Sequence, residues 1–166
     1  IYNKFCIWTK QKNFKNAFYK FYTNYYKLNT NLLICDSTSI NNLYGSDSVG
    51  VNPEYKKHNV SKLSIVCDSN KYILSTILCD VKNTFDKYST LEHEINVIPK
   101  HCDDLKYVQN DSNYFILIAD KGYTTSEKFI INTKNVKKVV PTKINAKIKN
   151  NKRNKKYIAT HRFKIE

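Results

Sequence analysis

Two short, almost wholly apolar runs constrain the fold most, because each is followed at once by an aspartate. The first run is Leu32–Cys35, before Asp36, and the second is Tyr114–Ala119, before Asp120. Apolar runs of this length between polar residues are typical of buried strands, and YFILIA reads as a strand covered on both faces. Because helices usually supply such cover, we expect an α/β fold with a mixed sheet flanked by helices.

The remaining segments fit this class. Residues 60–68 and 73–81 are rich in β-forming residues around a four-residue turn, which predicts a hairpin. Residues 86–99 space apolar side chains by three and four and predict a helix with Pro99 near its end. We further expect a loop over 43–53, a short helix near 125–132, a strand over 136–141 and a last helix beginning near Lys156.

The first thirty residues form a separate basic and aromatic segment. Residues 13–28 repeat aromatic side chains at helical spacing, with lysines on the other face. An amphipathic helix packed on the core is one interpretation, and a stacking surface for single-stranded nucleic acid is the other. We therefore divide the chain into an N-terminal helical segment, 1–30, and a main domain, 31–166.

Charge is unevenly distributed. The chain has 28 Lys and Arg residues against 14 Asp and Glu residues. Residues 1–35 contain six lysines and no acid, whereas residues 134–166 contain 12 basic residues and one acid, Glu166. Segregated lysine and arginine favour a polyanionic partner, because neutralising phosphates releases counterions. A solvated basic tail combined with the codon bias of an AT-rich genome is the alternative.

Cysteine and histidine patterns disfavour other chemistries. The five cysteines include no C-x-x-C pair, so we expect buried free thiols in a reducing compartment, cytoplasm or nucleus, and not a secreted protein. The four histidines adjoin no nucleophile pattern, and His101 with Cys102 falls short of a four-ligand zinc site.

No apolar run is long enough to span a membrane. Since no Met begins the chain, we expect a longer reading frame.

The two aspartates are candidate metal ligands. If the two buried strands are neighbours, Asp36 and Asp120 project at one edge of the sheet. Oxygen ligands without a Cys or His cluster favour Mg²⁺ or Mn²⁺, and Glu166 is available as a third ligand. An aspartate after a strand is alternatively a turn former or a helix N-cap.

At these residues the chain resembles a family, the DDE transposases of bacterial insertion sequences. The resemblance lies in Asp36-Ser37-Thr38-Ser39-Ile40, in Asn52–Lys57 with Ser61–Asp68, in Asn83–Asp86, in Ile118-Ala119-Asp120-Lys121-Gly122-Tyr123 and in Arg162–Glu166. It covers residues 32 to 166, and the segment around Asp120 is its most specific part.

The resemblance implies an RNase H-like fold with Asp36, Asp120 and Glu166 as catalytic, metal-binding residues. Such enzymes cleave and join DNA with Mg²⁺ or Mn²⁺, and two ions suit this chemistry. The implied partner is double-stranded DNA, both the transposon ends and the target. The resemblance also implies a homo-oligomer and no membrane partner. The expected DNA contacts are Lys62, Lys121, Lys152, Arg153, Lys155, Lys156 and Arg162.

Two other functions remain open. One is a catalytically inactive transposase remnant that binds DNA non-specifically. The other is a different RNase H-like nuclease, acting on RNA–DNA hybrids or junctions. Because Glu166 is the final residue, we expect the catalytic domain to be truncated at its C-terminal end. We recognise no helix-turn-helix, so a sequence-specific DNA-binding domain is expected upstream or lost.

Overall fold

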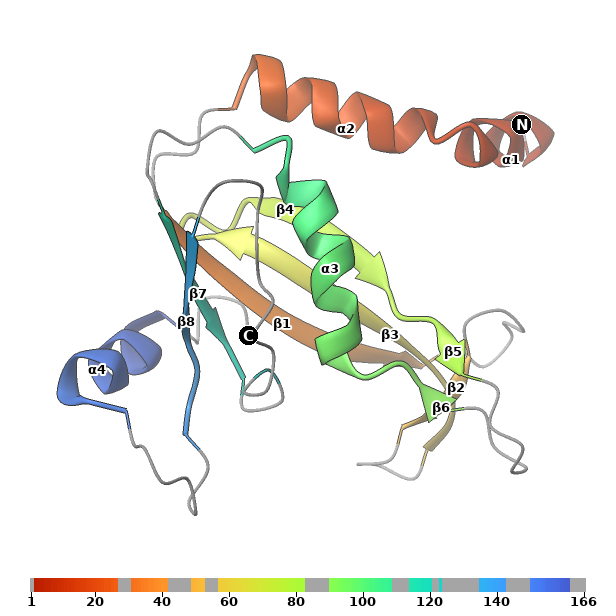
Figure 1. The fold of residues 1–166 in the computed structure, drawn as a ribbon. Helices are drawn as coiled ribbons and strands as arrows, with labels where there is room; N and C mark the ends of the chain where they lie inside the picture. The colour runs from red at the N-terminus through yellow and green to blue at the C-terminus, as the bar shows by residue number, and fades with distance from the viewer. Residues whose placement is uncertain are drawn as a thin grey trace.

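The computed structural model describes residues 2–26, 31–41, 49–52, 57–82, 90–108, 114–120, 123, 135–142 and 150–161. Within these ranges the chain forms four helices and eight strands (Figure 1). The helices are α1 (Tyr2–Lys10), α2 (Asn13–Asn24), α3 (Glu94–Leu105) and α4 (Lys152–His161). The strands are β1 (Leu32–Asn41), β2 (Gly50–Asn52), β3 (Lys57–Asp68), β4 (Ile73–Leu78), β5 (Val81–Lys82), β6 (Thr90–Leu91), β7 (Tyr114–Ala119) and β8 (Asn135–Val139).

The sheet is mixed, with β1 at its centre. Strand β1 pairs antiparallel with β3 on one side and parallel with β7 on the other. Strand β8 continues the parallel part beside β7, and β4 pairs antiparallel with β3. The five longer strands thus run in the order β4-β3-β1-β7-β8, while β2, β6 and β5 extend the sheet from the first part of β3. The expected α/β class, a mixed sheet flanked by helices, is confirmed.

Several elements lie where the sequence pattern predicts them. Strand β7 spans the whole apolar run, and β8 begins one residue before the predicted strand. Strands β3 and β4 form the predicted hairpin. Its turn is fixed by Asp68, whose Oδ1 accepts hydrogen bonds from the backbone N–H groups of Asn70 (2.8 Å) and Tyr72 (2.9 Å). These elements are predictable because local pattern and turn chemistry agree.

Strand boundaries differ in two places. We predict that the first strand ends before Asp36, but β1 continues to Asn41 because its antiparallel partner β3 continues beside it. The predicted loop over 43–53 contains β2, which pairs with β3 and with β6. In both cases a neighbouring strand supplies hydrogen bonds that the apolar pattern does not reveal.

The prediction for the helix over 86–99 is wrong in its boundaries. Residues 90 and 91 belong to β6, and α3 begins at Glu94 and passes through Pro99 to Leu105. A proline inside a helix costs about 3 kcal/mol. Burial of Ile98, Cys102 and Leu105, spaced by four and three, offsets this cost. The helix predicted near 125–132 lies outside the described residues.

Helix α3 covers one face of the sheet, and α2 lies beside the C-terminal end of α3 (Figure 1). The hydrophobic cluster on this face includes Leu33 of β1 and Ile98 of α3. Tyr22 of α2 is buried in the same cluster, and Phe18 packs against it. Tyr19 and Tyr26 are half-buried, whereas Phe14, Phe21 and Tyr25 are exposed. The interpretation of 13–28 as a helix packed on the core is therefore confirmed for one side of α2.

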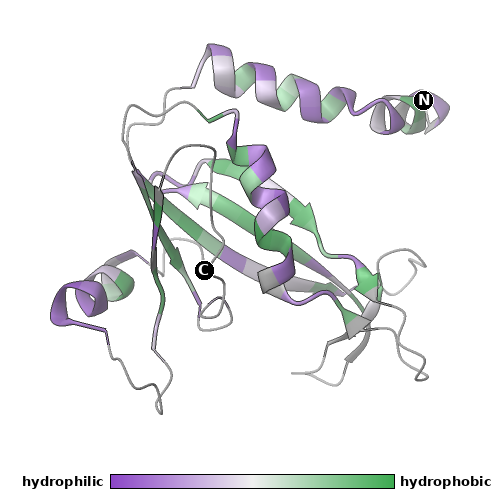
Figure 2. Cartoon of the chain, viewed as in Figure 1, coloured by the Kyte–Doolittle hydropathy of each residue, from purple (hydrophilic) through white to green (hydrophobic). Residues whose placement is uncertain are grey.

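The other face of the sheet carries α4. Leu32, Ile118 and Val139 form a second small cluster, against which Tyr157 and Ile158 of α4 pack. In Figure 2 the central strands are mainly hydrophobic and α4 is mainly hydrophilic. Helix α4 begins at Lys152, four residues before the predicted start near Lys156.

All five cysteines are free thiols, as predicted. Cys35, Cys67, Cys79 and Cys102 are buried and Cys6 is half-buried. Across the described ranges, the structure contains no helix with the length and hydropathy of a membrane span.

Candidate functional site

The two candidate aspartates occupy equivalent positions on neighbouring strands. The parallel register pairs Leu32 with Ile116 and ends with Cys35 opposite Ala119. The next residue of β1 is Asp36, and the first residue after the end of β7 is Asp120. Because neighbouring strands lie about 4.8 Å apart, this register brings two residues that are 84 positions apart in sequence next to each other.

Strand alternation places both aspartates on the face that α4 covers. Side chains of a strand alternate between the two faces. Leu32 and Ile118 belong to the cluster beneath α4, whereas Leu33 and Leu117 belong to the cluster beneath α3. Asp36 and Asp120 continue the first series, two residues beyond Ile34 and Ile118.

Their surroundings are partly open to solvent. Both aspartates are half-buried. Asp36 Oδ1 accepts a hydrogen bond from the backbone N–H of Ser37 (2.8 Å), and the carbonyl of Asp120 accepts one from the N–H of Tyr123 (3.0 Å). A carboxylate pair at this depth suits a hydrated cation, because Mg²⁺ retains several of its waters when it binds protein oxygens.

The third expected ligand, Glu166, lies outside the described residues, as do Lys121 and Arg162. The described helix α4 ends at His161, five residues before Glu166. Among the described residues no group of three potential metal ligands comes together. The structure therefore describes two of the three expected ligands.

The expected DNA contacts divide between the two faces. Lys152, Arg153, Lys155 and Lys156 are all exposed on α4. Lys62 lies opposite Ser39 in the register of β1 and β3, three positions from Asp36. Strand alternation therefore places Lys62 on the face opposite the aspartates, together with the buried Ser64 and Val66. The structure does not bring Lys62 together with the aspartate pair.

A buried polar network beneath α3 was not predicted from the sequence. His101 Nε2 lies 2.8 Å from Ser64 Oγ, and His101 Nδ1 lies 2.7 Å from Ser75 Oγ. Ser75 Oγ donates to Asp104 Oδ2 at 2.7 Å. Because Ser75 has one hydrogen, which Asp104 accepts, Nδ1 of His101 carries the proton and Nε2 accepts from Ser64.

Opposing influences set the ionisation of this network. Burial lowers the pKa of His101 to about 4, although the charge of Asp104 acts in the opposite direction. Burial alone would raise the pKa of Asp104, but hydrogen bonds from Lys15, Tyr19 and Ser75 lower it. Lys15 Nζ lies 2.6 Å from Asp104 Oδ1, which also accepts from the hydroxyl of Tyr19 at 2.5 Å.

This network is structural and not catalytic. His101 and Ser64 have 0% exposure and Ser75 has 1%, so no substrate reaches either hydroxyl. Instead the network joins α2 and α3 to strands β3 and β4. The spacing of three between His101 and Asp104 is the one local signal, because it puts both side chains on one face of a helix.

No family model matches the chain, and no curated protein matches it. Among solved structures, the chain is similar to the piggyBac transposase in its synaptic complex with hairpin DNA, with a TM-score of 0.49 and 15% sequence identity. The match covers 71% of this chain and 24% of that one, so the chain spans about a quarter of the transposase.

Proposed function

We propose that this chain is the catalytic core of a DDE transposase, which cleaves DNA strands and joins them to a target. The observation that carries the proposal is that Asp36 and Asp120 directly follow Cys35 and Ala119, the last residues paired between β1 and β7. Two half-buried carboxylates on neighbouring strands repel each other unless a cation or a proton lies between them. A divalent cation is thus the simplest occupant of this position.

The sheet supports an RNase H-like fold for this core. Three antiparallel strands, β4, β3 and β1, are followed by two parallel strands, β7 and β8. This order and these directions fit an RNase H-like sheet, with the two carboxylates on its central strands. Helix α4 packs on the same face, which is the face from which Glu166 would have to approach.

The donor set fits Mg²⁺ or Mn²⁺, because it consists of carboxylate oxygens. We assign Asp36, Asp120 and Glu166 as the ligands, with two ions as the expected number. Bound divalent ions would supply an activated hydroxyl nucleophile and stabilise the leaving oxygen of a phosphodiester. The exposed cations of α4, together with Lys121 and Arg162, are proposed to hold the DNA phosphates.

Metal binding tests the proposal most directly. Mn²⁺ should bind to the wild-type chain, and Asp120→Asn or Asp36→Asn should weaken binding at least tenfold, because each removes a charged ligand. Asp103→Asn is the matched control, since Asp103 is exposed on α3 and pairs with Lys106. Calorimetric titration measures all four proteins. Equal binding by the wild type and Asp120→Asn would refute the metal site.

Activity separates the three candidate functions. A DDE transposase should transfer a DNA 3′-hydroxyl end into a target in the presence of Mg²⁺, and Asp120→Asn should abolish transfer. Cleavage of RNA–DNA hybrids without strand transfer would instead support a different RNase H-like nuclease. DNA binding without metal binding or cleavage would support the inactive remnant.

A further inference from the structure

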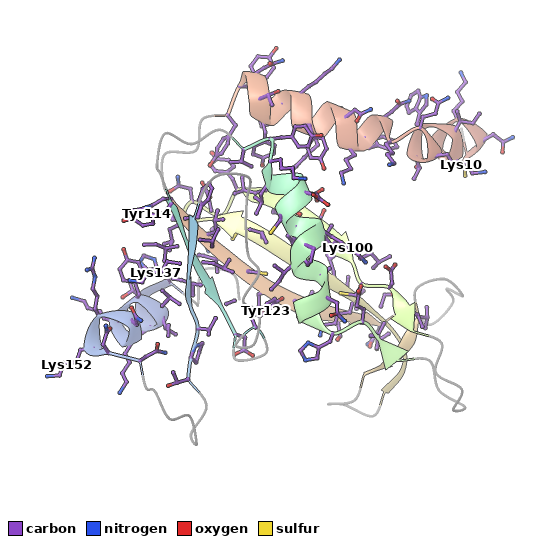
Figure 3. The ribbon with its side chains drawn as sticks, in the orientation of Figure 1. Lys10, Lys100, Tyr114, Tyr123, Lys137 and Lys152 are labelled. Carbon is purple, nitrogen blue, oxygen red and sulfur yellow. The ribbon has the colours of Figure 1, made fainter. Side chains whose placement is uncertain are left out.

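A pocket of about 180 Å³ lies between α4 and the edge of the sheet. The side chains at its rim are Tyr114 from β7, Lys137 from β8, and Arg153, Asn154 and Tyr157 from α4. Ile116 contributes to its apolar floor. Figure 3 shows Tyr114 and Lys137 on the strands beside α4. We call this pocket the α4 pocket.

The α4 pocket is positively charged. Lys137 and Arg153 come from different elements, and no acidic side chain among the described residues lines the pocket with them. The described segments 135–142 and 150–161 contain no Asp or Glu. Bringing two cations to one pocket is unfavourable unless an anion binds between them. The charge therefore selects an anionic ligand.

Tyr114, Tyr157 and Asn154 indicate which class of anion fits the pocket. Tyr114 is 47% exposed, and its ring and that of Tyr157 line the same pocket as the cations. Aromatic rings stack on bases and sugars, while Arg, Lys, Asn and Tyr side chains donate hydrogen bonds to phosphate oxygens. A nucleotide unit of a nucleic-acid strand combines both features in each repeating unit.

The position of the pocket relates it to the aspartate pair. Ile116 lies in β7, and Asp120 is the first residue after this strand, four residues further along the chain. At about 3.3 Å per residue this separation is about 13 Å, close to four nucleotide rises of a B-form strand. One strand can thus occupy the α4 pocket while its continuation reaches Asp36 and Asp120.

We propose that the α4 pocket binds a phosphodiester of a nucleic-acid strand. Lys137 and Arg153 contact the phosphate, and Tyr114 and Tyr157 contact the adjoining sugar or base. The direction of this strand toward Asp36 and Asp120 rests on the proposed function. The binding of a phosphodiester in the α4 pocket is independent of that function.

The test is a titration of the ¹⁵N-labelled chain with the dinucleotide d(pTpT), followed by NMR. Amide signals of Lys137, Arg153 and Asn154 should shift and saturate. The double variant Lys137→Ala/Arg153→Ala should weaken binding at least tenfold. Its matched control is Lys4→Ala/Lys10→Ala, which removes the same charge from exposed positions on α1, outside the pocket, and should weaken binding less than threefold.

Two further variants keep the result interpretable. Arg153→Lys should retain most of the binding, because it preserves the charge. Tyr114→Ala should weaken binding without changing its salt dependence, because it removes an uncharged contact. Equal losses in the two double variants, or saturating shifts confined to other parts of the chain, would overturn the proposal.

Asp120→Asn distinguishes this proposal from the proposed function. If the pocket binds d(pTpT) but Asp120→Asn leaves Mn²⁺ binding unchanged, the pocket proposal is supported and the transposase assignment fails. If Asp120-dependent metal binding occurs and the pocket gives no saturable shifts, the pocket is refuted and the metal site is supported.

Discussion

His101 shows how much the environment of one residue changes its chemistry. Its ring lies wholly inside the protein, between the hydroxyls of Ser64 and Ser75, and Asp104 reaches it through Ser75. The side chain of Tyr123 faces the same network, with its hydroxyl 3.5 Å from Ser64 Oγ. The imidazole is therefore held neutral, and a proton taken up at Nε2 would remove the acceptor of the Ser64 hydroxyl.

This environment predicts a pH dependence of stability. The unfolded chain binds a proton at His101 near pH 6.5, whereas the folded chain resists it down to a pKa of about 4. The free energy of unfolding should therefore be highest above pH 6.5 and fall between pH 6.5 and 4, by on the order of 3 kcal/mol. The pKa of Asp104 is lowered from its ordinary value of 3.8, so this group acts in the same direction only near and below that pH.

Urea denaturation at several pH values between about 7 and 4.5 measures this dependence. His101→Gln is the comparison, because its amide stays neutral throughout the range. The variant should be less stable than the wild type at pH 7 and should lose less stability on acidification. Parallel curves for the two proteins would contradict the assignment to His101.

Among the elements, α4 depends on few apolar contacts. Its described residues contain no fully buried side chain, and Tyr157 and Ile158 are the ones that pack on the sheet. A ten-residue helix is marginal without such packing. The position of the α4 pocket and of the exposed cations thus depends on these two side chains.

Ile158→Ala should therefore loosen α4 selectively. Removing a half-buried isoleucine should cost about 1–2 kcal/mol locally and speed amide exchange across α4 roughly tenfold, with little effect on β1 or β7. Hydrogen exchange followed by mass spectrometry or NMR measures this. Thr160→Ala is the control, because Thr160 is exposed on the same helix. Unchanged exchange in the isoleucine variant would show that other contacts hold α4.

On the scale of the whole molecule, basic charge lies at the two ends of the chain. The intervening residues 36–133 contain 10 basic and 13 acidic side chains. In Figure 1 α1 and α2 lie along the top of the view and α4 lies at the lower left, apart from them. The two basic regions are thus separate surfaces, and their contributions to the proposed DNA binding are separable.

DNA affinity should fall steeply with salt, mainly because of the α4 region. Each phosphate contact contributes about −0.9 to the slope of log K against log salt, so removing four cations should reduce its magnitude by as much as about three to four. The four substitutions to alanine are at Lys152, Arg153, Lys155 and Lys156. The control removes the same charge at Lys4, Lys10, Lys12 and Lys20. Fluorescence anisotropy with duplex DNA measures each slope, and equal reductions would refute a specific role for α4.

Much of the fold is predictable from local pattern. The apolar runs at Leu32–Cys35 and 114–119 become β1 and β7, and the hairpin follows from β-forming residues around a turn that Asp68 fixes. These elements depend on burial and turn chemistry, both of which are written within a few residues. Boundaries are less predictable, as at Asp36 and Pro99, because a neighbouring strand or a buried helix face outweighs the local signal.

The sequence by itself determined that two aspartates directly follow apolar, strand-forming runs and that basic charge gathers near the end of the chain. Only the tertiary structure decided that β1 and β7 are parallel neighbours whose pairing ends just before Asp36 and Asp120, that Lys62 faces away from them, and that Lys137 and Arg153 share a pocket. The physical reason is the distance in sequence over which each interaction acts. Side-chain periodicity is a local property, whereas pairing between residues 84 positions apart depends on the packing of the whole sheet.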